Sequence, residues 1–213
     1  MLTQCWFQSP TEMKSWALFR RGKWKRVKNA GGVFERYDRK EKDMEKIASF
    51  TIDHIKLQPG VYVSRKDKVG DSTITTFDLR MTSPNEEPVM NTAEMHTIEH
   101  LAATYLRNDE EWKERVIYWG PMGCMTGSYL IVKGSYDCEI IRELMIRTMD
   151  FIANFNDEVP GNTPDACGNY LMHDLPMAKW EAKRYAERLR TAFCCEYDML
   201  QRADINGMAF HDA

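Results

Sequence analysis

From Asn91 onward the chain predicts an amphipathic helix, which can form only if the rest of the fold covers its apolar side. Side chains recur at the spacing of one helical face: Ile98, Leu101, Ala102, Tyr105 and Leu106. Asn91, followed three residues later by Glu94, predicts the start, because the two can exchange hydrogen bonds with backbone N–H groups of the first turn. The opposite side of the helix remains for polar residues.

The segments around this helix predict a mixture of strands and helices. The clearest strand is STITTFDLRM (72–81), where alternate side chains face one way: Thr73, Thr75, Phe77 and Leu79. Other strands are predicted at 50–57, with a bulge near 53–54, and at 61–63, 116–119 and 128–132. Helices are predicted over 141–152 and from Asp174 to beyond residue 195. Because strands and helices do not alternate regularly, the predicted class is α+β.

Length and composition fit one soluble globular domain. The 213 residues are 43% hydrophobic and 29% charged. No run of about 18 apolar residues predicts a membrane span, and the N-terminus lacks the apolar core of a secretory signal. The six cysteines contain no C-x-x-C pair. Without a secretory signal, we expect free thiols in a cytoplasmic protein.

The first 43 residues differ from the rest of the chain. They hold 11 Lys+Arg against 5 Asp+Glu, whereas residues 44–213 hold 18 against 27. The basic stretch 20–26 could bind nucleic acid, but the composition favours a disordered tail. A purine-rich ribosome-binding sequence could also encode residues 39–43, so that 1–43 would be a translated leader before Met44. We expect a domain over 44–213, an extension over 1–43 that adds little, and no nucleic-acid partner.

The polar side of the first helix carries the sequence HTIEH (96–100). At about 100° per residue, His96, Glu99 and His100 share one arc that lies opposite the apolar stripe. This is the H-x-x-E-H order of the inverted zincins, in which two histidines bind a metal ion and a glutamate leans over it. The alternative interpretation is an ordinary solvent-exposed face.

A catalytic metal site needs a third protein ligand and an open position. Cys124 and Cys167 are candidates because each lies next to glycine in a loop-like segment, and their spacing does not choose between them. Cys138 and the pair 194–195 are expected to be packing thiols in helices. A set of two histidines and one cysteine suits Zn²⁺, Fe²⁺ or Co²⁺ and excludes Mg²⁺ and Ca²⁺.

Six short segments occur in one order along the chain: SFTIDH (49–54), TFDLR (76–80), PN (84–85), HTIEHL (96–101), GPMGCMTGSY (120–129) and ACGNY (166–170). This ordered set resembles the S-ribosylhomocysteine lyase family, the LuxS family. The resemblance runs from about Met44 to about Leu189, and residues 1–43 have no counterpart. It departs at 118–120, Tyr-Trp-Gly in place of Asp-Ile-Ser, and at Thr82, where cysteine is frequent.

The resemblance implies an α+β fold of the family's metallohydrolase type, with an antiparallel sheet packed against helices. It implies a homodimer with two active sites at the subunit interface. It also implies one divalent metal ion per subunit, held by His96, His100 and Cys167. Fe²⁺ is expected, with Zn²⁺ or Co²⁺ as alternatives.

The resemblance also assigns roles in catalysis and substrate binding. Cys124 and Glu99 become the acid/base pair. Three residues match positions that line the substrate pocket: Ser49, His54 and Arg80. Without the resemblance, Arg80 would be interpreted as half of a local ion pair with its neighbour Asp78.

The implied reaction cleaves S-ribosylhomocysteine to homocysteine and 4,5-dihydroxy-2,3-pentanedione, the precursor of autoinducer-2. This would place the protein in quorum sensing and in the recycling of S-adenosylhomocysteine. The substrate carbonyl must move along the ribose chain before homocysteine can leave by β-elimination. Each step forms an enediolate that a Lewis-acid metal stabilises, and each needs a base that can return its proton.

Two other classes of function remain as alternatives. An inverted-zincin peptidase would use Glu99 to activate a water, but those enzymes typically have a carboxylate as third ligand and a longer chain. A zinc-stabilised binding module that uses its basic tail would normally have four protein ligands. A third ligand from cysteine and an open position would favour the lyase.

Overall fold

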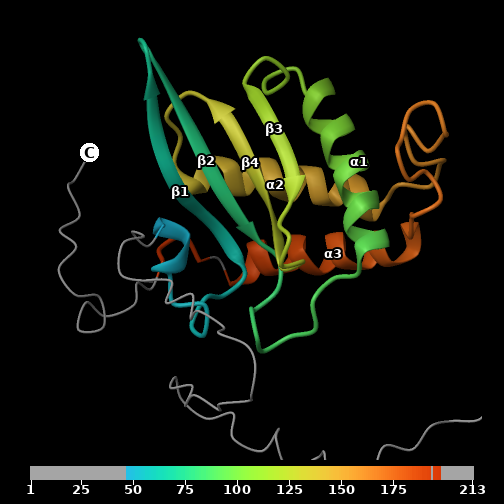
Figure 1. The fold of residues 1–213 in the computed structure, drawn as a ribbon, viewed down its shortest axis with the longest axis horizontal. Helices are drawn as coiled ribbons and strands as arrows, with labels where there is room; N and C mark the ends of the chain where they lie inside the picture. Colours follow the sequence, from blue (N-terminus) through green and yellow to red (C-terminus); the bar gives the residue numbers. More distant parts are fainter. Residues whose placement is uncertain (1–46, 193, 198–213) are drawn as a thin grey trace, which may run out of the picture. The chain divides into compact units, whose positions relative to one another are not determined.

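The computed structural model describes residues 47–192 and 194–197; the predicted extension over 1–43 lies outside them. Four antiparallel strands form one sheet in the order β1-β2-β4-β3 (Figure 1). The elements are η3 (Ala48–Phe50), β1 (Gly60–Val69), β2 (Ser72–Arg80), α1 (Thr92–Asn108), β3 (Val116–Pro121), β4 (Gly127–Lys133), α2 (Cys138–Ala153) and α3 (Leu175–Thr191). The predicted α+β class, an antiparallel sheet packed with helices, is confirmed.

The predicted alternation of the central strand is present in β2. Phe77 and Leu79 have no exposed surface and face the core, where Phe77 pairs with Leu130 of β4. Asp78 and Arg80 project from the other face, as a period of two requires. One strand therefore contributes both to the hydrophobic core and to a polar cluster on the opposite face.

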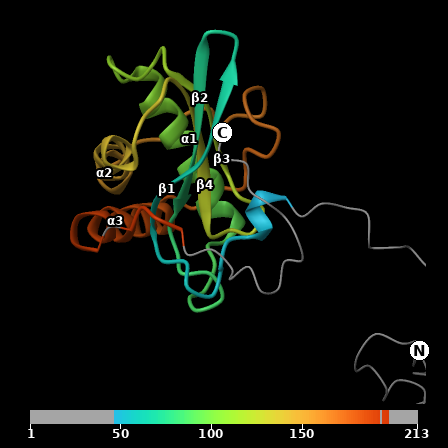
Figure 2. The same cartoon turned by 90° about the vertical axis from the view of Figure 1, so that its left-hand side faces the viewer.

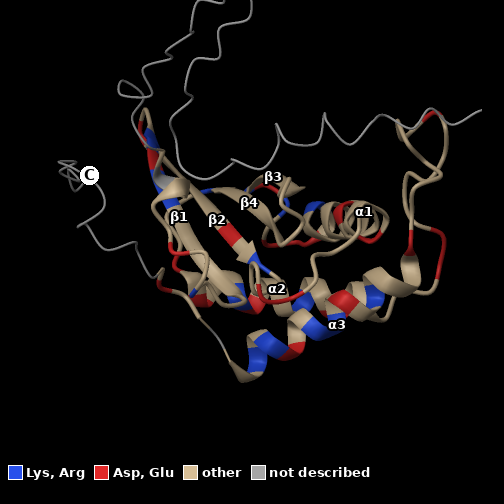
Figure 3. Cartoon of the chain, turned by 60° about the horizontal axis from the view of Figure 1, so that its bottom comes forward, with Lys and Arg blue, Asp and Glu red and all other residues tan. Residues whose placement is uncertain are grey.

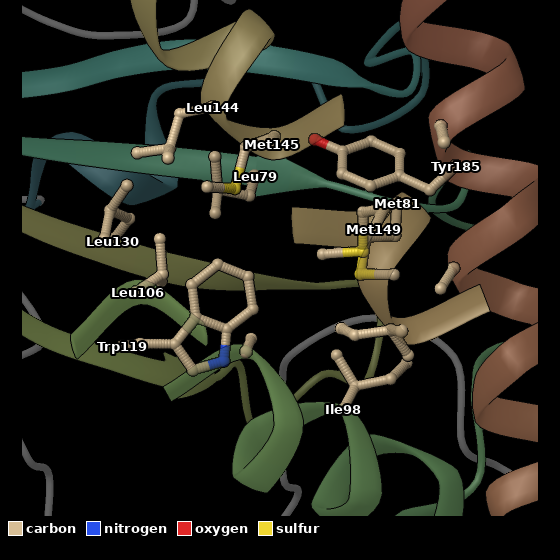
Figure 4. Close-up of a cluster of buried hydrophobic side chains, with 14 of the residues drawn as sticks. Leu79, Met81, Ile98, Leu106, Trp119, Leu130, Leu144, Met145, Met149 and Tyr185 are labelled. Atoms are coloured by element: carbon tan, nitrogen blue, oxygen red, sulfur yellow. The ribbon is translucent and has the colours of Figure 1, made fainter. Parts of the chain in front are cut away.

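The helices form a layer on one side of the sheet. α2 and α3 lie behind it, and α1 lies along the edge made by β3 (Figures 1 and 2). Figure 4 shows side chains from the sheet and the helices meeting in one buried cluster: Leu79 and Leu130 from the sheet, Ile98 from α1, Met145 from α2 and Tyr185 from α3. The apolar stripe predicted for the first helix supplies its part of this core.

The start of α1 follows the predicted capping arrangement. Asn91 occupies the N-cap, and a capping box pairs it with Glu94. The Glu94 carboxylate accepts a hydrogen bond of 2.6 Å from the Asn91 backbone N–H. This contact fixes the first turn and hence the angular position of the histidines that follow.

Two predicted elements are wrong. Residues 50–57 do not form a strand: η3 is followed by a turn in which the Asp53 side chain accepts a hydrogen bond from Ile55 N, a local alternative to strand pairing. The last helix ends at Thr191, so Cys194 and Cys195 lie outside it. Cys194 instead pairs with Gly60 at the start of β1, and its carbonyl accepts from Val61 N.

Charges of both signs are interspersed on the outer surface of α3 (Figure 3). Arg184 and Arg188 on this helix both bind Glu87, which lies in the segment between β2 and α1. These contacts tie the segment to α3 just before α1 begins. Within the described part of the chain, no helix is both long and apolar enough to cross a membrane.

Candidate active site

His96 and His100 lie one turn apart on α1, and both are half-buried. The His96 Nδ1 lies 2.8 Å from the Met172 carbonyl oxygen, and the His100 Nδ1 lies 2.7 Å from that of Pro160. A carbonyl oxygen can only accept, so each Nδ1 carries the proton and donates it. In the neutral ring this leaves the lone pair on Nε2, the form in which imidazole binds a metal ion.

Cys167 completes this pair from the loop between α2 and α3. Its Sγ lies 3.4 Å from His96 Nε2. Tetrahedral zinc, with bonds of about 2.0–2.1 Å to nitrogen and about 2.3 Å to sulfur, would separate the two atoms by about 3.5–3.6 Å. The His96 and His100 rings meet edge to face at 89°, so their lone pairs can converge from different planes. The geometry and the donor set fit a divalent metal ion.

The structure thus brings together three predicted ligands, His96, His100 and Cys167, in a group that could hold a metal ion. Cys124 is not part of that group among the described residues. Spacing left the choice between the two cysteines open, and position favours Cys167, as the resemblance implies, because the loop carrying Cys167 folds back over α1. The hydrogen bonds from His96 to Met172 and from His100 to Pro160 hold that loop in place.

His173 belongs to the same group, and sequence reasoning missed it. Ligand atoms of the four residues all lie within 4.8 Å of one another. The His173 ring stacks on His96, with centroids 4.3 Å apart and planes inclined by 17°. Burial lowers the pKa of His173, and the neighbouring charges of His96 and His100 lower it further. It lies six residues after Cys167, just before the α3 N-cap Asp174, a position with no distinctive sequence pattern.

Cys124 lies in the tight turn between β3 and β4 and is exposed. Its Sγ lies 3.0 Å from the Thr126 hydroxyl. Arg80 donates to that hydroxyl at 2.5 Å, so the hydroxyl proton is free to point at the sulfur. Partial burial raises the pKa of the Cys124 thiol, but hydrogen bonds from Thr126 and the charge of Arg80 outweigh it, and the net pKa falls below the ordinary value. The sulfur is therefore predisposed to ionise.

Arg80 is fixed from its other side by Asp78. The two side chains are 3% and 2% exposed and form an ion pair of 2.5 Å. The local ion pair anticipated from the sequence is therefore present. Arg80 also approaches Cys124, with 3.8 Å between Nη1 and Sγ. A buried pair that is fully hydrogen-bonded holds its geometry, so Asp78 orients the guanidinium toward the turn.

The Cys124 turn is attached to the beginning of α1. Met90, the residue before the Asn91 N-cap, donates its backbone N–H to the Met125 carbonyl at 3.1 Å. Met125 itself has a positive φ of 59°, which closes the turn tightly. Glu99 lies half-buried on α1 next to His100. Two elements thus carry the candidate groups: the turn holds the thiol of Cys124, and α1 holds Glu99 and the histidines. The hydrogen bond between Met90 and Met125 joins these two elements.

Comparison with known sequences decides the family. Residues 47–193 match the S-Ribosylhomocysteinase (LuxS) family. The chain belongs to the LuxS family. This span contains α1, the loop with Cys167, and the Cys124 turn.

Curated relatives of this LuxS chain are similar over nearly their whole length. An S-ribosylhomocysteine lyase from Phocaeicola vulgatus is 61% identical over 142 residues, which cover 67% of this chain and 88% of the relative. One from Clostridium acetobutylicum is 61% identical over 146 residues, 68% of this chain and 92% of the relative. One from Borreliella burgdorferi is 49% identical over 146 residues, 68% and 93%.

Ser49 and His54, two of the residues predicted to line the substrate pocket, lie away from the histidines and Cys167 in this LuxS chain. Ser49 is in η3, and His54 follows in the turn, where its Nδ1 contacts the Ile52 carbonyl at 3.0 Å. Both are half-buried. This segment precedes β1 at one edge of the sheet, whereas α1 lies along β3 at the other edge (Figure 1). Within one chain, therefore, Ser49 and His54 do not join the group formed by the histidines and Cys167.

Proposed function

We propose that this chain is an S-ribosylhomocysteine lyase that cleaves its substrate to homocysteine and 4,5-dihydroxy-2,3-pentanedione. The observation that carries the proposal is the match of residues 47–193 to the LuxS family. The combination of two histidines and a cysteine supports it, because the carboxylate ligand typical of an inverted-zincin peptidase does not occur in the group. The second product is the precursor of autoinducer-2.

His96, His100 and Cys167 would hold one divalent metal ion per subunit, with Fe²⁺ the expected ion and Zn²⁺ or Co²⁺ the alternatives. When bound, such an ion acts as a Lewis acid beside the oxygens of the open-chain sugar. The metallohydrolase-type label for the fold forms part of the same proposal. The three protein ligands leave an open position, as catalytic sites require.

Cys124 would act as a base toward carbon-bound protons. Its lowered pKa favours the thiolate, which can take a proton from a carbon next to the substrate carbonyl and return it to the adjacent carbon. Repetition of this transfer moves the carbonyl along the ribose chain without any external oxidant or reductant. Arg80 and Thr126 keep the sulfur in place and stabilise its charge.

Glu99 would be the second proton-transfer group. It shares the helical arc of His96 and His100 and approaches the sugar from α1, whereas Cys124 approaches from the β3–β4 turn. Two groups in different positions can serve protons on different atoms of one sugar. Neither is needed to hold the metal ion.

The last step releases homocysteine by β-elimination. One of the two bases removes the proton from the carbon between the shifted carbonyl and the carbon that bears sulfur. The electron pair of that C–H bond forms a carbon–carbon double bond, and the carbon–sulfur bond breaks. Homocysteine leaves as a thiolate and is then protonated. The enol that remains becomes the pentanedione.

A second copy of the chain would complete each substrate pocket. Ser49 and His54 lie at the sheet edge opposite α1, so they can meet the substrate only if a partner subunit supplies them. The surface around them is apolar: Ile47, Phe50 and Ile55 are 57%, 68% and 66% exposed. Exposed apolar side chains of this kind gather at interfaces. The proposed assembly is a homodimer with shared active sites, in which Arg80 also lines the pocket, and the proposed location is the cytoplasm.

The direct test is incubation of the purified, metal-loaded protein with S-ribosylhomocysteine. Homocysteine released during turnover is measured with a thiol reagent, and the pentanedione by mass spectrometry. Both products should appear in equal amounts. Failure of the metal-loaded protein to release any thiol would contradict the proposed function.

A further inference from the structure

His173 carries a buried nitrogen that nothing in the described chain satisfies. Its Nδ1 lies 3.2 Å from the Thr97 hydroxyl. That hydroxyl donates its single proton to the Ala93 carbonyl and accepts from Asp174 N, so toward His173 it can only accept. Nδ1 therefore carries the proton. The remaining nitrogen, Nε2, is a buried lone pair without a hydrogen-bond partner.

The stacking of the two rings excludes His173 as a metal ligand alongside His96. Their planes are inclined by only 17° at a centroid distance of 4.3 Å. A metal ion lies about 2 Å from an imidazole nitrogen and in the plane of the ring, because the lone pair lies in that plane. An ion in the plane of His96 is outside the plane of His173. The distance of 3.4 Å between His96 and Cys167 assigns the ion to His96.

An unpaired buried acceptor next to such a centre needs a donor, since leaving it unpaired costs free energy. We propose that His173 Nε2 accepts a hydrogen bond from a hydroxyl group of the sugar chain when the substrate enters. This inference rests on the proposed function, which supplies a polyhydroxylated substrate. It assigns His173 a substrate-binding role in which the Thr97 contact fixes the tautomer and the stack on His96 fixes the ring.

Two matched substitutions distinguish the contribution of the Nε2 acceptor to substrate binding from that of the stacked ring. His173→Gln can place an amide oxygen near the position of Nε2. His173→Asn reaches only the position of Nδ1, so it keeps the contact with Thr97 and loses the acceptor. Both remove the stacked ring, so any effect of the ring on metal binding is common to them. Each is made together with Cys124→Ala, which slows turnover without touching the proposed ligands.

The measurements are metal affinity by chelator competition and S-ribosylhomocysteine affinity by calorimetry on fully metal-loaded protein. We expect equal metal affinities in the two variants. Substrate binding by the His173→Asn protein should be weaker than that by the His173→Gln protein by about tenfold, the size of one hydrogen bond. Equal substrate affinities would overturn the inference. Loss of metal in the Asn variant alone would also overturn it, because His173 would then serve the metal site.

His173→Phe covers the case in which neither polar variant folds. Phenylalanine keeps a ring against His96 and has no nitrogen. It should retain metal and bind substrate about tenfold more weakly than the Cys124→Ala parent; unchanged substrate binding would overturn the inference. If the metal-loaded Cys124→Ala parent binds no substrate at all, the proposed function itself fails, and that outcome is distinct from equal binding by parent and variants.

Discussion

His96 Nε2 lies 3.4 Å from Cys167 Sγ, although 71 residues separate the two along the chain. The contact exists because the loop after α2 returns to α1, where Met172 and Pro160 accept hydrogen bonds from the two histidines. The same carbonyls fix which nitrogen of each ring faces the sulfur. Backbone groups thus hold the candidate metal-binding group in place, as well as its three side chains.

Replacing each of the two loop cysteines by alanine should separate metal binding from catalysis. Cys167→Ala removes a ligand, and its metal content should fall well below one ion per chain. Cys124→Ala should keep its metal content near one ion per chain while turnover falls by roughly 10²-fold or more, the scale of losing a proton-transfer group. Elemental analysis and the thiol assay measure the two effects. A metal-free Cys124 variant beside a loaded Cys167 variant would reverse the assignment.

Thr126 should control the pH at which Cys124 ionises. Burial raises the pKa of this thiol, but Thr126 and Arg80 lower it more, so the thiolate persists below the ordinary thiol range and is lost as pH falls through the lowered pKa. Thr126→Val removes the hydroxyl, which should move the acidic limb of activity to higher pH. The same shift should appear in alkylation of Cys124, followed by peptide mass spectrometry.

Thr126→Ser is the matched control, because serine retains the hydroxyl that accepts from Arg80 and faces the sulfur. Its alkylation profile should coincide with that of the unmodified chain. Coincident profiles for the valine and unmodified proteins would show that Thr126 does not set the Cys124 pKa.

The sequence predicted the arrangement of the candidate site residues wherever local periodicity defines their positions. The arc of His96 and His100 follows from helical spacing alone, and the alternation of β2 places Asp78 beside Arg80. The choice of Cys167 over Cys124 does not follow from spacing, because the return of a loop to α1 is a tertiary event. His173 was missed for the same reason. Its neighbours on α1 are distant in sequence, and a single histidine before a helix has no distinctive pattern.

Local chemistry also explains the segments where the strand and helix predictions were wrong. Alternating apolar residues at 50–57 suggested a strand, but Asp53 can satisfy Ile55 N through its side chain and form a turn instead. Periodicity predicted a last helix that runs past Thr191, where α3 ends. Cys194 instead forms a backbone bridge with Gly60 at the start of β1. A hydrophobic pattern contains no information about such competing hydrogen bonds.

Glu87 should stabilise the fold most at neutral pH. A hydrogen bond from Arg188 lowers its pKa more than burial raises it, and the charges of Arg188 and Arg184 add to the lowering. A carboxylate with a lowered pKa contributes stability above its unfolded pKa and loses it as pH falls through the folded value. Glu87→Gln should therefore reduce the free energy of unfolding at pH 7 by about 1–2 kcal/mol, with the difference vanishing in acid. Urea titrations at several pH values measure this.

Glu110→Gln is the control for that experiment. Glu110 pairs with Lys113, but its side chain is 90% exposed, so the charge is screened and the stability should not change measurably. A Glu87 variant as stable as the Glu110 variant at neutral pH would show that the contacts to α3 do not stabilise the fold.

The first 43 residues should be dispensable. The family match begins at residue 47, after this basic segment. A chain that starts at Met44 should fold with the same melting temperature and release homocysteine at the same rate per metal ion. Circular dichroism and the thiol assay provide the comparison. A loss of turnover in the shortened chain, at equal metal content, would assign the segment a role.

Shared active sites should allow two inactive chains to restore each other. A Cys167→Ala chain lacks a metal ligand but retains Ser49 and His54, whereas a Ser49→Ala/His54→Ala chain has the opposite defect. In a mixed dimer, one site receives the intact metal group from one chain and the intact pocket residues from the other, while the second site receives both defects. Random pairing should therefore recover about a quarter of normal activity, because half of the dimers are mixed. Co-expression of the two chains with different tags isolates the mixed dimer for assay.

A mixture of Cys167→Ala and His96→Ala chains is the control, since both defects lie in the metal group and no intact site can form. If the tagged mixed dimer is as inactive as this control, the two chains do not complete each other's sites, and the proposal of shared active sites is wrong.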